Sequence, residues 1–157
     1  MKILSIDPGY ERLGIAIIEK ERGQKDSLLY SECFKTDAKI PFEDRLLEIG
    51  NKVEELINTY SPFVLAIETL FFSKNTKTAM RVAETRGTII YIAKKSKLNI
   101  KEINPMEIKL AVTGDGKSDK QQMTKMVQLI LKIDKKATDD EYDAIACGLA
   151  CCALLRY

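Results

Sequence analysis

A continuous apolar run in the middle of the chain constrains the fold most strongly. Residues 63–67 are all apolar, a proline precedes them at position 62, and Glu68 follows directly. A run of this length without alternating polar residues is typical of a central strand that is covered on both faces. The sequence therefore predicts a sheet between helices, with a carboxylate at the end of its central strand.

The N-terminal region predicts an antiparallel meander of strands. A β-type run at 3–6 ends at the turn sequence 7–9, and a second apolar run resumes at 13–18. After a polar stretch, residues 28–36 form a third run. Asp7 thus follows the first strand directly, just as an acid follows the central strand.

Helical periodicity dominates the rest of the chain, interrupted by a fifth strand at 99–103. Helices are predicted over residues 41–60, 75–95, 106–112, 118–131 and 139–155. Ser118 and Thr138 are suited to cap the last two helices through their hydroxyls. The expected fold class is α/β, a mixed five-stranded sheet flanked by helices, in one domain that covers residues 1–157.

Small residues recur every four positions in the helix predicted at 75–95, at Ala79, Ala83 and Gly87. Such a stripe allows close approach to another backbone, which could belong to the same domain or to a second copy of the helix. We expect it to face the sheet of its own domain, with a symmetric dimer contact as the alternative.

The residue types present exclude several kinds of chemistry. The chain has no histidine, which removes Ser-His-Asp and Cys-His nucleophiles, histidine bases and histidine-ligated zinc. Its cysteines form no CxxC pair and are expected to be reduced core residues. They are Cys33, Cys147, Cys151 and Cys152. With no apolar run of about 18 residues and no signal-peptide pattern, a cytoplasmic protein without membrane association is expected.

Positive charge is concentrated in one segment. Residues 74–136 contain 15 basic and 6 acidic side chains, whereas residues 1–73 contain 9 basic and 13 acidic ones. A local net charge of +9 suits a polyanion such as a nucleic-acid backbone. A solvated helix surface explains the charge equally well, so the count alone does not decide between them.

Four carboxylates stand where they could share a site: Asp7, Glu68, Asp140 and Asp143. The first two follow apolar strands, and the last two are three residues apart, on one face of a helix. A carboxylate set without histidine or thiolate suits the hard cations Mg²⁺ and Mn²⁺, and two such ions can drive phosphodiester hydrolysis. Alternatively, Asp7 caps a turn and the acids at 139–141 complement a helix dipole.

Several motifs together resemble the RuvC family of bacterial Holliday-junction resolvases, collinearly over essentially the whole chain. They are Ile6-Asp7-Pro8-Gly9 with Gly14, Ala66-Ile67-Glu68 followed by Phe71 and Lys74-Asn75, Arg86-Gly87, Lys109, Lys120, and Asp140-x-x-Asp143-Ala144. Each motif is short, so the resemblance depends on their order and spacing.

The resemblance implies a ribonuclease-H-like fold and an Mg²⁺-dependent homodimer that nicks four-way DNA junctions in symmetric pairs, leaving 5′-phosphate and 3′-hydroxyl ends. It also implies two Mg²⁺ ions per subunit, replaceable by Mn²⁺, and RuvA and RuvB as partners. Asp7, Glu68, Asp140 and Asp143 fall on the family's catalytic and metal-binding acids. Asp140 takes the third place rather than Asp139 because the family spacing to the last acid is three.

The resemblance also implies DNA contacts. Phe71 falls on an aromatic that stacks on unpaired bases, although a core position is the alternative, one that the adjacent Phe72 fits better. Lys109 and Lys120 fall on basic positions near the active site, where solvated lysines are the alternative. The basic segment adds Lys74 and Lys117 as predicted DNA contacts. Tyr10 and Thr69 depart from the expected pattern and leave the preferred cutting sequence open.

Three other functions compete with junction cleavage. A ribonuclease-H-like nuclease of the kind proposed to process ribosomal RNA shares the Asp-x-Gly hairpin, but lacks the segment from Glu68 to Asn75. Actin-like ATPases share the same hairpin and need a second domain, which 157 residues do not supply. A scaffold that binds junctions without cutting them would not need all four acids.

Overall fold

The computed structural model describes residues 1–70, 76–134 and 136–155, and places a mixed sheet at the centre of the molecule. Its strands are β1 (Lys2–Asp7), β2 (Arg12–Glu19), β3 (Ser27–Lys35), β4 (Val64–Glu68) and β5 (Asn99–Ile103). They lie in the order β3-β2-β1-β4-β5, in which the β1–β2 and β2–β3 pairs are antiparallel and the β1–β4 and β4–β5 pairs are parallel. The predicted five-stranded mixed sheet is confirmed.

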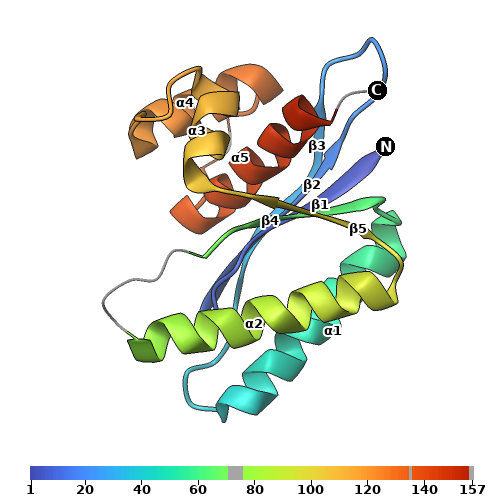
Figure 1. Cartoon of the computed structure of the whole chain (residues 1–157), viewed down its shortest axis with the longest axis vertical. Helices are drawn as coiled ribbons and strands as arrows, with labels where there is room; N and C mark the ends of the chain where they lie inside the picture. The colour runs from blue at the N-terminus through green and yellow to red at the C-terminus, as the bar shows by residue number, and fades with distance from the viewer. Residues whose placement is uncertain (71–75, 135, 156–157) are drawn as a thin grey trace.

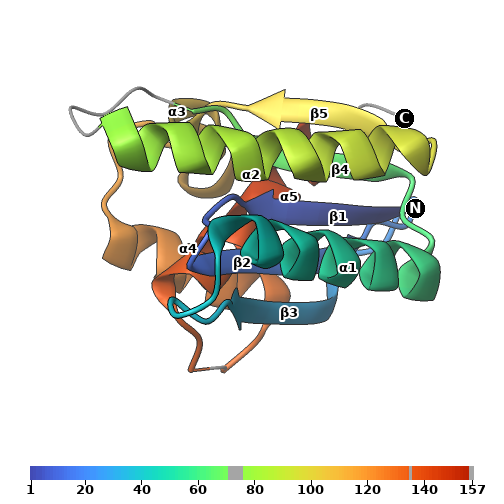
Figure 2. The same ribbon diagram turned by 90° about the horizontal axis from the view of Figure 1, so that it is seen from below.

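Helices cover both faces of this sheet (Figures 1 and 2). They are α1 (Phe42–Tyr60), α2 (Thr76–Lys95), α3 (Pro105–Thr113), α4 (Lys120–Leu131) and α5 (Asp139–Leu154). The first two pack together on one face, and α5 lies on the other, with α3 and α4 packed against it. No helix among the described residues is long and apolar enough to span a bilayer.

Alternating side chains of the central strands enter two separate cores. Leu4 and Ile6 of β1 pack in the core beneath α1 and α2, whereas Ile3 packs in the core with α5. The same alternation in β4 buries Leu65 on one face and Ala66 on the other. The apolar run is therefore a central strand buried on both sides, as its composition predicts.

Glycines allow α5 to lie directly on the sheet. A Cβ atom at Gly14 of β2 would stand 1.9 Å from the backbone oxygen of Asp140, and one at Gly148 would stand 2.6 Å from Ser5 Oγ. Because Gly14 is also the register partner of Asp7, this contact brings the start of α5 beside the end of β1.

The outward side of α2 differs from the prediction. Ala83 and Gly87 are exposed, and a Cβ at Gly87 would meet nothing within 4 Å among the described residues. The sheet is instead contacted by the bulkier side of the helix, including the fully buried Ile89. The expectation that the small-residue stripe faces the domain's own sheet is therefore wrong, because larger aliphatic residues bury more apolar area there.

Helix caps and cysteines follow the predictions in part. Thr138 caps α5 by accepting a hydrogen bond from the Glu141 N–H, as predicted. Ser118 does not cap α4, since Asp119 does so in a reciprocal capping box. Cys147, Cys151 and Cys152 are free buried thiols, whereas Cys33 is only half-buried and is not a core residue.

Candidate active site

The four predicted carboxylates come from three elements that meet at one edge of the sheet. Asp7 is the last residue of β1 and Glu68 the last of β4, and these strands are parallel neighbours. Asp140 and Asp143 lie in the first two turns of α5, which packs on β1 and β2. All four side chains are half-buried. The fold thus gathers acids that are up to 136 positions apart in the chain.

The acids carry negative charge that nearby cations do not balance. Burial, followed by the charges of Asp143, Glu68 and Asp140, raises the pKa of Asp7 to about 7. The pKa values of Glu68 and Asp143 are also raised, with burial as the first cause in each case. Crowded, desolvated carboxylates favour the binding of a proton or a metal cation. The chemistry of this donor set therefore fits a divalent cation.

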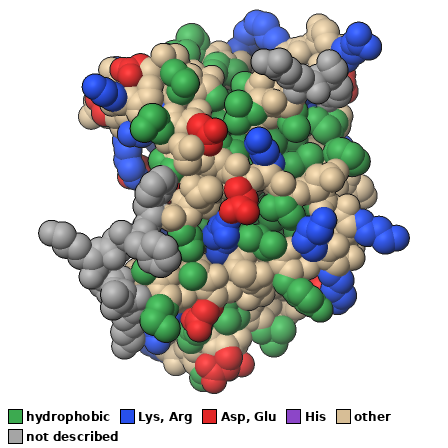
Figure 3. Space-filling model, viewed as in Figure 1, with side chains coloured by type: hydrophobic (Ala, Val, Ile, Leu, Met, Phe, Trp, Pro, Cys, Tyr) green, Lys and Arg blue, Asp and Glu red, His purple; other side chains and the backbone are tan. Residues whose placement is uncertain are grey.

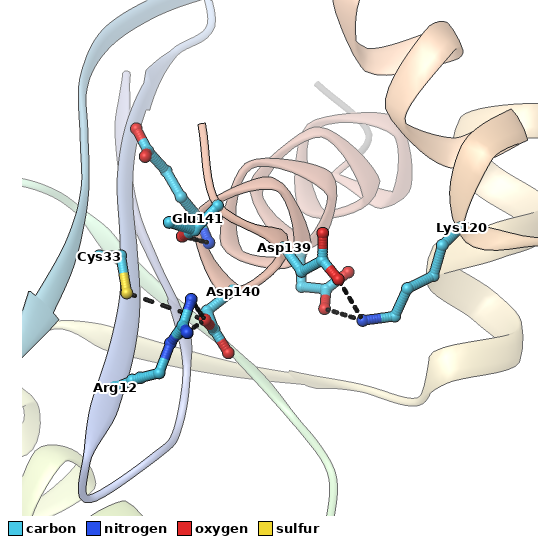
Figure 4. A network of polar contacts seen from close by, with 8 residues as sticks. Arg12, Cys33, Lys120, Asp139, Asp140 and Glu141 are labelled. Carbon is cyan, nitrogen blue, oxygen red and sulfur yellow. Dashed lines mark hydrogen bonds and ion pairs between the residues drawn. The ribbon is translucent and has the colours of Figure 1, made fainter. Parts of the chain in front are cut away.

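Two basic side chains contact acids of the site on α5 (Figure 4). Lys120 Nζ lies 3.5 Å from an oxygen of Asp143 and 3.5 Å from an oxygen of Asp139. Arg12 Nε and Nη2 each lie 2.7 Å from Asp140 Oδ2. These cations neutralise part of the negative charge of the carboxylates, as a bound metal ion also would.

The two acids at the start of α5 differ in exposure and direction. The side chain of Asp139 is 78% exposed, whereas that of Asp140 is 29% exposed and is directed toward β2. The charge of Asp140 raises the pKa of Asp7, whereas both Asp139 and Asp140 raise the pKa of Asp143. The choice of Asp140 over Asp139 as a metal ligand stays a prediction.

In the part of the chain that the structure describes, no three acidic or thiol side chains already surround a common point at metal-binding distance. Two of the carboxylates, Asp140 and Asp143, instead pair with the protein cations Arg12 and Lys120.

Two hollows adjoin the carboxylates. One of ≈ 170 Å³ is lined by Glu68, Pro105, Ile108, Lys109, Lys120, Met123, Asp143 and Ala146. The other, of ≈ 250 Å³, is lined by Asp7, Pro8, Glu68, Thr69, Leu70 and Pro105. Thr69 Oγ1 is buried and has no hydrogen-bond partner among the described residues. An unpaired hydroxyl beside carboxylates suits a polar occupant of the second hollow.

Only some of the residues predicted to contact DNA line these hollows. Lys109 and Lys120 line the first one together with acids of the site. Lys117 is exposed in the loop between α3 and α4 and lines neither of the two. Phe71 and Lys74 lie outside the described residues. On the face shown in Figure 3, basic side chains are dispersed among hydrophobic and acidic ones.

Sequence reasoning missed two arginines that contact the site. Arg12 pairs with Asp140, 128 positions away, so that no local spacing could reveal the pair. Arg86 donates from Nε to the backbone oxygen of Glu68 at 3.2 Å and also pairs with Glu102, which ties α2 to the ends of β4 and β5. Its place in the Arg86-Gly87 motif was a signal, but the motif does not indicate what the side chain contacts.

Comparison with known sequences places the chain in a family. The family model described as crossover junction endodeoxyribonuclease RuvC matches residues 3–152. Crossover junction endodeoxyribonuclease RuvC of Thermosipho melanesiensis is 43% identical over 147 residues, which cover 93% of each chain. The protein of the same name from Mycolicibacterium smegmatis is 37% identical over 97% of this chain and 83% of the relative.

Solved structures agree with the sequence relatives. RuvC of Thermus thermophilus in complex with a Holliday junction substrate superposes with a TM-score of 0.90 at 28% identity, covering 96% of this chain and 92% of that one. A second structure of Thermus thermophilus RuvC gives a TM-score of 0.86 at 28% identity. These likenesses confirm the predicted ribonuclease-H-like fold. With the matches in sequence, they show that the chain belongs to the RuvC family of crossover junction endodeoxyribonucleases.

Proposed function

We propose that this protein resolves four-way DNA junctions by hydrolysing phosphodiester bonds at the carboxylate edge of its sheet, with Asp7, Glu68, Asp140 and Asp143 as the metal-binding acids. The observation that carries this proposal is the convergence of acids from β1, β4 and α5. Burial, together with the charges of the other acids, raises the pKa of Asp7 to about 7. Membership in the RuvC family supplies the substrate class, since a relative is known in complex with a Holliday junction.

The RuvC family consists of metal-dependent nucleases, and we propose Mg²⁺ as the metal, with two ions per subunit and Mn²⁺ as a substitute. When bound, the two ions would activate a water molecule and stabilise the leaving 3′ oxygen, giving 5′-phosphate and 3′-hydroxyl ends. Asp7 holds a proton in part of the metal-free population at neutral pH, because its pKa is about 7. That proton must leave when Asp7 becomes a ligand.

Basic and aromatic residues are proposed to hold the DNA. Lys109 and Lys120 line a hollow together with Glu68 and Asp143, where an ammonium group can bind a phosphate next to the reacting one. Burial and Asp143 raise the pKa of Glu68, and the charges of the two lysines offset part of that rise. Phe71, Lys74 and Lys117 remain proposed DNA contacts on the basis of family resemblance and charge.

We also propose a homodimer, because paired cuts on opposite strands need two active sites. The outward side of α2 supports a contact through that helix: Ala83 and Gly87 are exposed, and so are Met80 (65%) and Tyr91 (67%). Small residues beside exposed apolar ones suit close packing of a second helix. RuvA and RuvB are proposed as partners from family membership.

The test is cleavage of a synthetic four-way junction with Mg²⁺, alongside a linear duplex and a structured RNA. Wild-type protein should cut the junction preferentially, and the Asp7→Asn variant should bind the junction without cutting it. Asp44→Asn on the exposed start of α1 is the matched control and should cut like the wild type. Cleavage by Asp7→Asn at the wild-type rate, or a preference for RNA, would contradict the proposal.

A further inference from the structure

One carboxylate of the proposed metal site is already held by a cation of the protein itself. Arg12 is the first residue of β2. Its Nε donates to Asp140 Oδ2 at 2.7 Å, and its Nη2 lies 2.7 Å from the same oxygen (Figure 4). The Cys33 thiol lies 3.8 Å from the same oxygen. Three polar groups of the protein therefore converge on one oxygen of a proposed metal-binding carboxylate.

The pair is positioned by the fold and not only by mutual attraction. Gly14 of β2 lies against the backbone of Asp140, so closely that a Cβ atom would stand 1.9 Å from the Asp140 oxygen. Arg12 is two residues before Gly14 on the same strand. The contact between β2 and α5 thus fixes both backbones, which reduces the entropy lost when the side chains pair.

Lys120 does not hold Asp143 in the same way. Its single ammonium group is 3.5 Å from Asp143 and equally far from Asp139, and its side chain is 70% exposed. A guanidinium presents several donors in a fixed plane, and a short two-donor contact with a carboxylate is stronger than a shared ammonium contact. Of these two cations, Arg12 therefore has the stronger hold on its acid.

We propose that Arg12 is a positioning residue that holds Asp140 in the metal-free protein and competes with a divalent cation for it. This inference rests on the proposed function, because it assumes that Asp140 is a metal ligand. The guanidinium and the metal are both positive and would lie against the same carboxylate, so close approach of one disfavours the other. Metal binding then requires Arg12 to release Asp140, and Arg12 lowers the affinity of the site.

The experiment is calorimetric titration of Mn²⁺ and Mg²⁺ into the full DNA-free chain. Arg12→Gln should bind either metal about three- to fivefold more tightly than wild type, the size expected for loss of a partly exposed ion pair. Arg12→Lys keeps the charge and should stay near the wild-type affinity. Arg22→Gln is the control, because it removes an exposed arginine beyond the opposite end of β2 and should change nothing.

A second readout protects the test against a folding defect. The rise in melting temperature on adding metal reports affinity for the folded state, and it should be larger for Arg12→Gln and for Arg12→Ala than for wild type. Weaker or unchanged metal affinity in these variants, relative to Arg22→Gln, overturns the role of Arg12.

Failure of this inference differs from failure of the proposed function. If wild type binds no metal, or if Asp7→Asn binds it as tightly as wild type, the proposed metal site is wrong and the Arg12 inference falls with it. If Asp7→Asn weakens binding while Arg12→Gln does not strengthen it, only the role of Arg12 is wrong.

Discussion

The two faces of the sheet serve different purposes. On the α5 face, glycines let the helix backbone lie directly on β1 and β2, and this contact delivers Asp140 beside Gly14. On the α1 and α2 face, large aliphatic side chains fill the interface, and Ala83 and Gly87 of α2 are exposed. On the α5 face, close backbone packing brings the acids of the site together. On the α1 and α2 face, side-chain packing stabilises the sheet, and part of α2 stays exposed.

The largest effect on the cleavage rate should come from substituting one of two neighbouring acids on the α5 face. Asp140→Asn should lower the rate of junction cleavage by about 10³-fold, because a lost metal ligand removes several kcal/mol of transition-state stabilisation. Asp139→Asn should stay within a few-fold of wild type, since its side chain is 78% exposed. Single-turnover cleavage rates with saturating Mg²⁺ measure both. A larger loss for Asp139→Asn would exchange their assigned roles.

Removing the buried charge of Asp7 should change how stability depends on pH. The folded-state pKa is about 7, above the ordinary 3.8, so between pH 4 and 7 the unfolded state binds fewer protons than the folded one. Metal-free wild type should therefore lose stability as pH rises through this window, by a few kcal/mol from this group. Asp7→Asn should lack that loss. Urea unfolding in EDTA at pH 4.5 and 8 compares the two, and parallel pH profiles would contradict the assignment.

A methyl group added to a glycine should have opposite effects on the two faces. Gly148→Ala on α5 forces a Cβ toward Ser5 Oγ at 2.6 Å and should cost about 1–3 kcal/mol through overpacking. Gly87→Ala on α2 meets open space and should stabilise the fold by about 0.5–1 kcal/mol through helix propensity. Thermal and urea unfolding give both values. If both substitutions changed the free energy of unfolding in the same direction, the packing of the two helices would not differ as described.

A charge added to the exposed side of α2 should have the smallest effect on fold stability. It should instead weaken the proposed dimer. Gly87→Glu should leave the monomer folded because the position is exposed, and should weaken the proposed dimer by placing like charges close together. Light scattering across a dilution series measures the effect, with Glu84→Gln on the same helix as a control. If the dimer is unchanged, the dimer interface does not include this part of α2.

The sheet and the grouping of the acids could be predicted from the sequence. The apolar run before Glu68 is typical of a covered strand, and Asp7 and Glu68 end parallel neighbours in the structure. The orientation of the α2 stripe could not be predicted, because alanine and glycine suit a close contact and an exposed surface equally well. Arg12 was missed because its partner is 128 positions away and only the folded β2–α5 contact brings them together.

The most direct test of the central claim is anomalous diffraction from crystals grown with Mn²⁺. The account predicts manganese bound at the edge where β1 and β4 end, with ligand oxygens from Asp7, Glu68 and Asp143, and with Asp140 released from Arg12. Manganese bound elsewhere, or a carboxylate edge that stays empty at saturating Mn²⁺ while the metal-dependent cleavage proceeds, would contradict it.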